Sequence, residues 1–413
     1  MEEARRRRRW IRTTAVVLVL LACGGSAALA LHVVAERRWT AMKADWQALL
    51  EEARRQGQSR APLRGEAVEG NAWDDYAVVL AEVRTLYDLE SQAAPRYLKE
   101  APQSNRKLVE RVLARHPSLI ESIRRAALRR QVHLSLEWKE GALTMPGRHG
   151  AATVAPLAAC RARFFAEEGR FLEAARLLVE TCRFAADIDH VEHAELPFQE
   201  LRELIASGRL SGEELLQLDR ELEQLDREFP RRGRRAALEL VSLGAQFVKT
   251  GRSMTGQLVG LRSDPEGALW RYGWSAHLMK AEAFAVLQDA VRQLQAADER
   301  PWAESKEVLK TLTRDLSAHR NPIVQIAPEE VLGSDLQGRG HRTQLRLLRL
   351  AARYKATGEI LDLEDPFGAR LVTRTSDGAL KAWGVGPEGF DHGGIGDFRF
   401  DPDGKDIVLD VRR

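Results

Sequence analysis

The chain has 413 residues, of which 44% are hydrophobic and 30% are charged. This balance supplies enough apolar side chains for two or three domains and excludes a disordered, collagen-like or disulfide-scaffold protein. The formal charge is only +3. Residues 1–35 hold six arginines and two glutamates, so the remaining chain carries 57 basic against 58 acidic residues. A balanced body of this kind argues against a nucleic-acid partner.

The first predicted element is a membrane anchor. Residues 1–14 form a basic stub that contains five consecutive arginines, and residues 15–35 form an apolar run without Asp, Glu, Lys or Arg. A helix needs about 20 such residues to cross the hydrocarbon layer. Because basic flanks remain in the cytoplasm, we expect a single-pass protein of the bacterial inner (cytoplasmic) membrane. Its N-terminus is then cytoplasmic and its body periplasmic (extracytoplasmic).

Three other interpretations of this segment stay open. A signal peptide could be cleaved after Ala30, Cys23 could carry a lipid, or Arg7-Arg8-Arg9 could belong to a twin-arginine export signal. The apolar run continues to Ala35, which fits neither a cleavage at Ala30 nor a polar tether after Cys23. An uncleaved anchor therefore fits the sequence best.

A helical body follows the anchor. Residues 36–57 are charged with helical spacing and predict a stalk that continues the membrane helix. Residues 71–317 predict an irregular, mainly α-helical domain with apolar residues at spacings of three and four. Within it, Ser211 and Glu214 form a capping box, which predicts the start of a helix.

The strongest local pattern is a helical hairpin at residues 154–188, where two amphipathic helices meet at Gly169. The hairpin resembles a single tetratricopeptide-type repeat through Leu157, Ala158, Gly169, Phe171, Ala174 and Leu177. No second clean copy is evident, so a regular solenoid is not predicted.

Two of the three cysteines lie on this hairpin. Cys160 and Cys182 fall on different helices at similar distances from the turn. Outside the cytoplasm a disulfide between them is chemically allowed. Two buried free thiols are the alternative, because the direction of the side chains does not follow from the spacing.

The C-terminal part changes in character. Residues 318–340 are rich in Gly and Pro and predict a linker, and residues 341–413 predict a small α+β module. Its helix, at about residues 341–357, is followed by short β-type runs separated by Gly-containing turns. Those runs predict a short antiparallel sheet at residues 369–374, 380–385 and 407–411.

A set of motifs in this module resembles a known family. Asp365-Pro366-Phe367-Gly368 is followed by Trp383-Gly384-Val385-Gly386-Pro387, Gly389 and Asp391. About 70 residues are thereby similar to the C-terminal part of the major pseudopilin of type II secretion. The resemblance implies a helix on a small antiparallel sheet and an acidic loop that holds calcium. It does not extend to prepilin processing, because Arg12-Thr13-Thr14-Ala15 stands where the cleavage signal belongs.

The residues that this resemblance offers to calcium crowd a Gly-rich loop. Calcium prefers six to eight hard oxygen ligands, which carboxylates and backbone carbonyls supply. Asp and Gly also populate turns that bind no metal, so turn formation is the alternative. The acidic residues concerned are Asp391, Asp397, Asp401, Asp403 and Asp406.

The densest His and carboxylate cluster elsewhere spans residues 187–195. His190 and His193 could share a metal from one face of a helix, although a solvated helix end explains the same pattern. No nucleophile elbow, phosphate-binding Gly loop or CxxC pair is present in the sequence. No catalytic residue and no required cofactor are therefore predicted.

The whole arrangement, including Asn71-Ala72-Trp73 and Tyr76, is similar to uncharacterised single-pass bacterial envelope proteins. We expect a membrane-anchored extracytoplasmic scaffold or interaction protein with a protein partner in the envelope, associated with a secretion or pilus-type assembly. One alternative is an extracytoplasmic enzyme, a metal-dependent hydrolase with a site between helices. The other is a calcium or small-ligand sensor that uses the C-terminal loop.

Overall fold

The computed structural model describes ten single positions between Cys23 and Ala44 and the residues 58–84, 86, 88–100, 103–132, 137–139, 142–144, 148–188, 191–229, 276–298, 300–320, 324, 328–368, 370–401 and 405–412. The ten single positions have a helical backbone, and the side chains of Leu29 and Val33 are exposed. The basic stub at 1–14 lies outside the described residues, as does most of the predicted membrane helix at 15–35 and stalk at 36–57. Among the helices that the structure does describe, none is both long and apolar enough to cross a bilayer.

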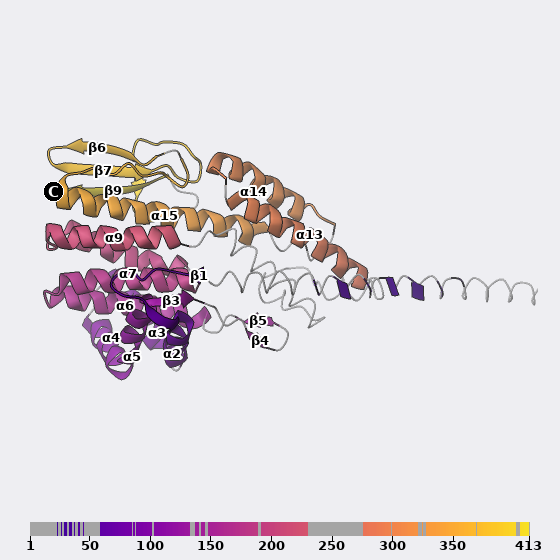
Figure 1. The fold of residues 1–413 in the computed structure, drawn as a ribbon, viewed down its shortest axis with the longest axis horizontal. Coiled ribbons are helices and arrows are strands. Elements are labelled where there is room, and N and C mark those ends of the chain that lie inside the picture. Colours follow the sequence, from indigo (N-terminus) through magenta and orange to yellow (C-terminus); the bar gives the residue numbers. More distant parts are fainter. Residues whose placement is uncertain are drawn as a thin grey trace, which may run out of the picture.

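The described chain is mainly helical, as predicted, and its first part is a compact group of short helices (Figure 1). The side chain of Asn71 caps the first of them by accepting a hydrogen bond from the amide of Trp73 at 3.2 Å. These helices are α2 (Ala72–Val83), α3 (Asp88–Glu100), α4 (Gln103–Arg115) and α5 (Ser118–Ala127). A small sheet of order β1-β3-β2 lies beside α2, formed by β1 (Gln58–Ser59), β2 (Val68–Asn71) and β3 (Arg129–Val132). A separate hairpin pairs β4 (Glu137–Lys139) with β5 (Ala142–Thr144).

Two helical hairpins follow: α6 (Arg148–Glu167) with α7 (Phe171–Asp187), and α8 (Glu195–Ala206) with α9 (Gly212–Glu228). The first hairpin confirms the prediction, and its turn residue Gly169 has a φ of +82°, a conformation that favours glycine. The second was not predicted as a hairpin, yet Gly208 has a φ of +71° at the equivalent place. The capping box is confirmed, because Ser211 and Glu214 each accept a hydrogen bond from the other's backbone amide.

The possible disulfide between Cys160 and Cys182 is not formed, since both are free and buried. The thiol of Cys160 donates toward the carbonyl of Ala94 in α3, with the two heavy atoms 3.6 Å apart. The thiol of Cys160 is therefore directed toward α3. Burial raises the pKa of both thiols.

The predicted linker at 318–340 is wrong over most of its length. After α13 (Ala276–Asp298) and α14 (Trp302–Ser317), a single helix, α15, runs from Pro328 to Thr357. Proline suits the first position of a helix, where an amide has no intrahelical partner. Gly340 serves packing rather than flexibility, because a Cβ there would lie within 2.1 Å of the ring of Phe400.

The C-terminal module is a four-stranded sheet that packs on α15 (Figure 1). Its order is β6-β7-β9-β8, with β6 antiparallel to β7 and β7 antiparallel to β9. These three strands pair antiparallel as predicted, but β8, which was not predicted, runs parallel to β9, so the sheet is mixed. The chain after β7 crosses to the far side of β9 before it forms β8, which explains the parallel pair. The strands are β6 (Val372–Ser376), β7 (Ala379–Gly384), β8 (Gly396–Asp397) and β9 (Asp406–Arg412).

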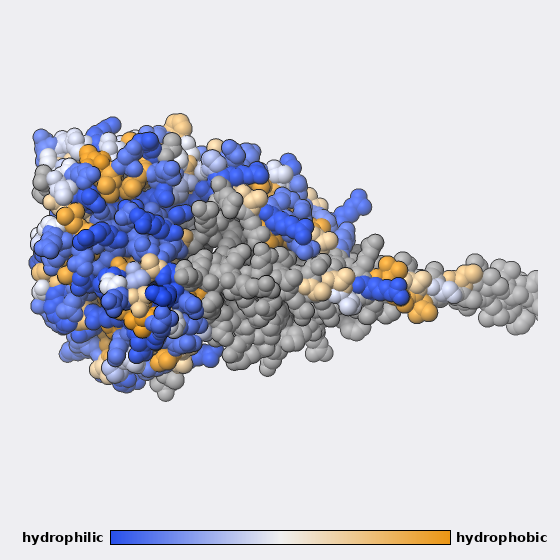
Figure 2. All heavy atoms as spheres, in the orientation of Figure 1, coloured by the Kyte–Doolittle hydropathy of each residue, from blue (hydrophilic) through white to orange (hydrophobic). Residues whose placement is uncertain are grey.

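Helix α15 joins the module to the body, because it contacts the sheet and also packs along α9. At the sheet, Gly384 lets β7 approach the helix, since a Cβ there would lie 2.4 Å from Cγ2 of Thr343. The buried apolar residues of the body, of α15 and of the sheet form one continuous cluster. The face of the molecule shown in Figure 2 is mostly hydrophilic over the described elements.

Candidate interaction site

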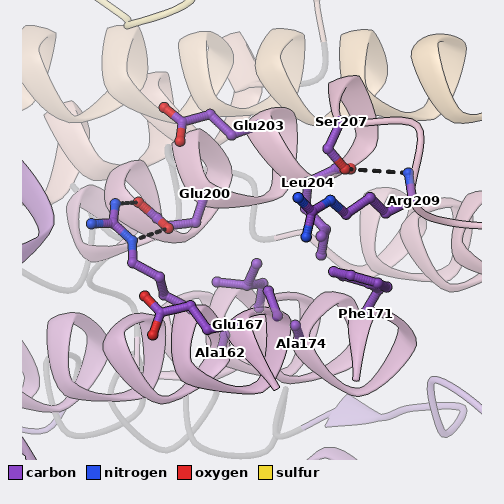
Figure 3. A pocket seen from close by; sticks show the side chains of 12 residues that line it. Ala162, Glu167, Phe171, Ala174, Glu200, Glu203, Leu204, Ser207 and Arg209 are labelled. Atoms are coloured by element: carbon purple, nitrogen blue, oxygen red, sulfur yellow. Dashed lines mark hydrogen bonds and ion pairs between the residues drawn. The ribbon is translucent and has the colours of Figure 1, made fainter. Parts of the chain in front are cut away.

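An open pocket of about 260 Å³ lies between α6, α7 and α8 and is named here the groove (Figure 3). The two helical hairpins create it, because α8 packs across the pair formed by α6 and α7. Its floor is apolar, formed by Ala162, Ala166, Phe171, Ala174, Leu178 and Leu204. Its rim is polar, formed by Arg163, Glu167, Glu200, Glu203, Ser207 and Arg209.

One end of the groove is closed by an ion pair. Nε of Arg163 donates to Oε2 of Glu200 at 3.0 Å, and a second guanidinium nitrogen donates to the other oxygen of the same carboxylate. Arg163 also donates to the carbonyl of Leu98 in α3 at 3.2 Å. Burial raises the pKa of Glu200, which the charge of Arg163 opposes. The charges of Arg163 and Glu200 therefore cancel at this end, and the guanidinium of Arg163 already donates to Glu200 and Leu98.

The other end carries an uncompensated positive charge. The guanidinium of Arg209 lies 5.2 Å from the centre of the Phe171 ring, within cation–π range. The backbone amide of Arg209 donates to the hydroxyl of Ser207 at 3.3 Å, which fixes the start of its side chain (Figure 3). No carboxylate of the described part of the chain pairs with this guanidinium. No local pattern in the sequence pointed to this site, because its residues come from three different helices and from the turn after α8.

A second polar cluster, named here the strap junction, holds the segment 60–64 against the body. Arg60, whose side chain is 3% exposed, pairs with Asp187 and donates to the carbonyl of Arg129 at 3.0 Å. The hydroxyl of Tyr76 donates to the same Asp187 carboxylate at 2.5 Å. Burial and this carboxylate raise the pKa of Tyr76. Arg64 pairs with Glu180 of α7 and Glu221 of α9.

Arg183 of α7 completes the strap junction from the other side. Its guanidinium donates to the carbonyls of Ala127 at 3.1 Å and Ala61 at 2.9 Å, and it pairs with Glu228 of α9. Burial lowers the pKa of Arg183 to about 10. The strap junction therefore ties the segment that follows the predicted stalk to α5, α7 and α9 at once.

The cluster at residues 187–195 is described only in part, and its described carboxylates Asp187 and Glu195 bind different partners. Asp187 belongs to the strap junction, and His190 lies outside the described residues. Glu195 pairs with His341 at 3.5 Å and accepts a hydrogen bond from Gln344 at 3.1 Å. Burial alone would raise the pKa of Glu195, but the contacts with His341 and Gln344 lower it. Across the described ranges, no group of three His, Cys, Asp or Glu could hold a metal ion.

The acidic loop uses its carboxylates within its own turns. Asp391 accepts hydrogen bonds from the indole of Trp383 at 2.8 Å and from the amide of Gly393 at 2.7 Å, which lower its pKa. The buried Asp406 accepts from the amides of His392 and Gly394 at 3.2 and 2.8 Å.

The predicted calcium set has three further residues, of which the structure describes Asp397 and Asp401. Asp397 is exposed and accepts from the amide of Phe398 at 2.6 Å. Asp403 lies outside the described residues, and Asp401 is described at the end of the loop. Calcium binding by this loop and its alternative, turn formation without a metal, both stay predictions.

The buried Asp365 holds a second turn together. It accepts hydrogen bonds from the amides of Val385 and Phe367 at 2.7 and 3.1 Å and lies 3.2 Å from the hydroxyl of Thr343. Burial raises its pKa to about 6 despite these donors. The Asp-Pro-Phe-Gly motif singled out Asp365 in the sequence. The sequence did not predict that its carboxylate contacts both Thr343 of α15 and Val385, which follows β7.

The chain matches no family model, and no curated protein or solved structure is significantly similar to it. The function of this chain must therefore be inferred from the groove, the strap junction and the sequence.

Proposed function

We propose that this chain is a membrane-anchored, extracytoplasmic interaction protein of the bacterial envelope. It acts as a scaffold for a protein partner close to a secretion or pilus-type assembly. The groove is the observation that carries the proposal. It combines an apolar floor, a closed neutral end and one unpaired guanidinium at Arg209. Such a combination of apolar area and fixed polar groups suits the binding of a protein segment.

The strap junction supports the anchored part of the proposal. A tether is useful only if it holds the body firmly, and the strap junction joins the segment after residues 15–57 to three helices. Breaking a buried ion pair costs about 3–5 kcal/mol, so each such pair resists detachment. The anchor itself rests on the apolar run at residues 15–35 and the arginines before it.

The two hairpins and the C-terminal module support the scaffold part. Hairpin α6–α7, which resembles a single tetratricopeptide-type repeat, packs against hairpin α8–α9, and stacked helical hairpins commonly build binding surfaces. A helix that packs across a small sheet, with Asp365 bridging them, fits the pseudopilin-like assignment of residues 341–413. Since α15 contacts both α9 and the sheet, the two parts form one platform with separate surfaces.

Protease protection tests the orientation. Protease added to spheroplasts that express the full chain is expected to remove everything beyond the stalk and leave a short protected fragment. A chain that remains intact until detergent is added would contradict an extracytoplasmic body.

Crosslinking of intact envelopes tests the interaction. Affinity-tagged full chain is expected to yield discrete crosslinked species, and Arg209→Glu should reduce their yield several-fold. Arg314→Glu is the matched control, because Arg314 is 72% exposed on α14, far from the groove lining. The absence of any crosslinked species would contradict the proposal.

A further inference from the structure

The turn-rich segment 386–401, named here the acidic loop segment, exposes two large apolar side chains. Phe390 is 65% exposed and Ile395 is 60% exposed, the latter next to β8. Both belong to one short turn-rich segment, and exposed large apolar side chains can mark an interaction surface. The segment also carries four carboxylates, Glu388, Asp391, Asp397 and Asp401, against the single cation of Arg399. It is therefore both apolar and acidic.

The groove offers complementary groups at one end. Its floor is open, and its rim glutamates lie within ion-pair distance of arginines, namely Glu167 of Arg106, Glu200 of Arg163 and Glu203 of Arg202. Among the described residues, the guanidinium of Arg209 has no carboxylate partner. A segment that fills it should offer apolar side chains for the floor and a carboxylate for Arg209. An arginine paired with a carboxylate in a partly dry site forms strong, directional hydrogen bonds.

The acidic loop segment does not fill the groove of its own chain, because Phe390 and Ile395 remain exposed. It does lie close by. Nη1 of Arg202 in α8 is 3.9 Å from Asp397, and its guanidinium lies 5.3 Å from the centre of the Phe398 ring. The same helix supplies Glu203 to the groove. The segment and the groove thus lie beside the same helix.

We propose that the groove binds the acidic loop segment of a second copy of this chain. Phe390 and Ile395 cover the apolar floor, and Glu388, which is 67% exposed, meets Arg209. Because segment and groove are neighbours, a two-fold axis lets each copy insert its segment into the other's groove, as in closed dimers. The inference rests on the proposed function, whose partner it names.

Association of the full chain in detergent, followed by sedimentation velocity, tests this proposal. The wild type is expected to dimerise reversibly. Arg209→Glu and Glu388→Arg should each weaken dimerisation at least tenfold, since each places like charges together. A mixture of the two variants should restore it, because each groove then faces a segment of opposite charge. Arg314→Glu should leave it unchanged.

A wild type that stays monomeric over a wide concentration range would overturn the proposal. So would a wild-type dimer whose dissociation constant is left unchanged by both Arg209→Glu and Glu388→Arg. All the substituted side chains are exposed, so we expect every variant to fold. Circular dichroism of each variant checks that its helix content equals that of the wild type.

Photocrosslinking in cells separates this proposal from the wider function. A benzoylphenylalanine at position 390 is expected to crosslink to groove peptides of a second copy, and one at the exposed Ile360 is not. A crosslink from position 390 to a different protein would overturn the second-copy proposal while supporting an interaction function. No crosslink from position 390 in any cell fraction would count against both.

Discussion

Carboxylates are neutralised in different ways in the helical body and in the C-terminal module. In the body, Asp187 meets Arg60, and Asp226 meets three arginines of α15. In the module, Asp365 and Asp406 accept hydrogen bonds from backbone amides. The difference follows from local structure. Helix amides are already bonded within the helix, so only side chains remain, whereas turns leave amides free.

The comparison gives the arginine-rich composition a structural role. Of the 63 basic residues only 11 are lysines. A guanidinium can bind two acceptors at once, as Arg183 does with two carbonyls. Arginine can therefore join three helices through one side chain, which lysine does less well. The buried carboxylates of the body depend on such contacts, whereas Asp365 and Asp406 of the module accept backbone amides.

The strap junction should give the largest effect. Replacing Arg60 with Met leaves the Asp187 carboxylate buried without its cation, and we expect a loss of about 3–5 kcal/mol in the free energy of unfolding. Urea denaturation of the detergent-solubilised full chain, followed by circular dichroism, measures it. The double variant Arg60→Met with Asp187→Asn should lose less than the single one. A loss below about 0.5 kcal/mol in Arg60→Met would show that ion pairs do not hold the body.

The module should respond to loss of an acceptor rather than of a cation. Asp365→Ala leaves the amides of Val385 and Phe367 without partners, so we expect a loss of about 2–4 kcal/mol at pH 5. Replacing Arg346, the nearest cation that acts on Asp365, should not reproduce this loss. An equal loss in the Arg346 variant would show that the carboxylate of Asp365 depends on a cation, as the carboxylates of the body do.

The pH dependence of Asp365 sharpens the comparison. Its pKa is raised in the folded protein to about 6 from an ordinary 3.8. The folded state therefore binds the proton more tightly, and the stability that this residue contributes falls as pH rises from about 4 to about 6. The unfolding free energy of the wild type minus that of Asp365→Asn should therefore fall as pH rises over that range. A value of this difference that rises with pH would contradict the raised pKa.

Weakening the contact between α9 and α15 should give a smaller effect, because several arginines of α15 pair with the same carboxylate of α9. Asp226 retains Arg342 and Arg349 when Arg346 is replaced by Gln, so we expect a loss of about 1 kcal/mol that shrinks in high salt. Arg227→Ala is the control, since its pair with Glu223 is exposed and should be worth less than about 0.5 kcal/mol. A loss above 3 kcal/mol would mean that the arginines are not interchangeable.

Calcium should give the smallest effect. The carboxylates of Asp391 and Asp406 already accept two hydrogen bonds each, so millimolar calcium is expected to leave the melting temperature of the full chain unchanged. Magnesium serves as the control for ionic strength. A calcium-specific rise, abolished by Asp391→Asn, would show that the loop exchanges its amides for a metal.

Local signals in the sequence predicted local structure well. Gly169 and the Ser211 capping box ended and began helices as expected, because each acts within one turn of chain. The glycines of residues 328–340 misled the prediction of a linker, since the need for Gly340 comes from the distant Phe400. The groove could not be predicted, because Phe171 and Arg209 come together only after two hairpins have packed.

The groove as an interaction site is the central claim, and one measurement tests it most directly. A benzoylphenylalanine at position 166, a half-buried position of the groove lining, is irradiated in intact cells that express the full chain. A discrete crosslinked species that is lost with Arg209→Glu and kept with Arg314→Glu is the predicted result. No crosslinked species, or one that Arg209→Glu leaves unchanged, would contradict the claim.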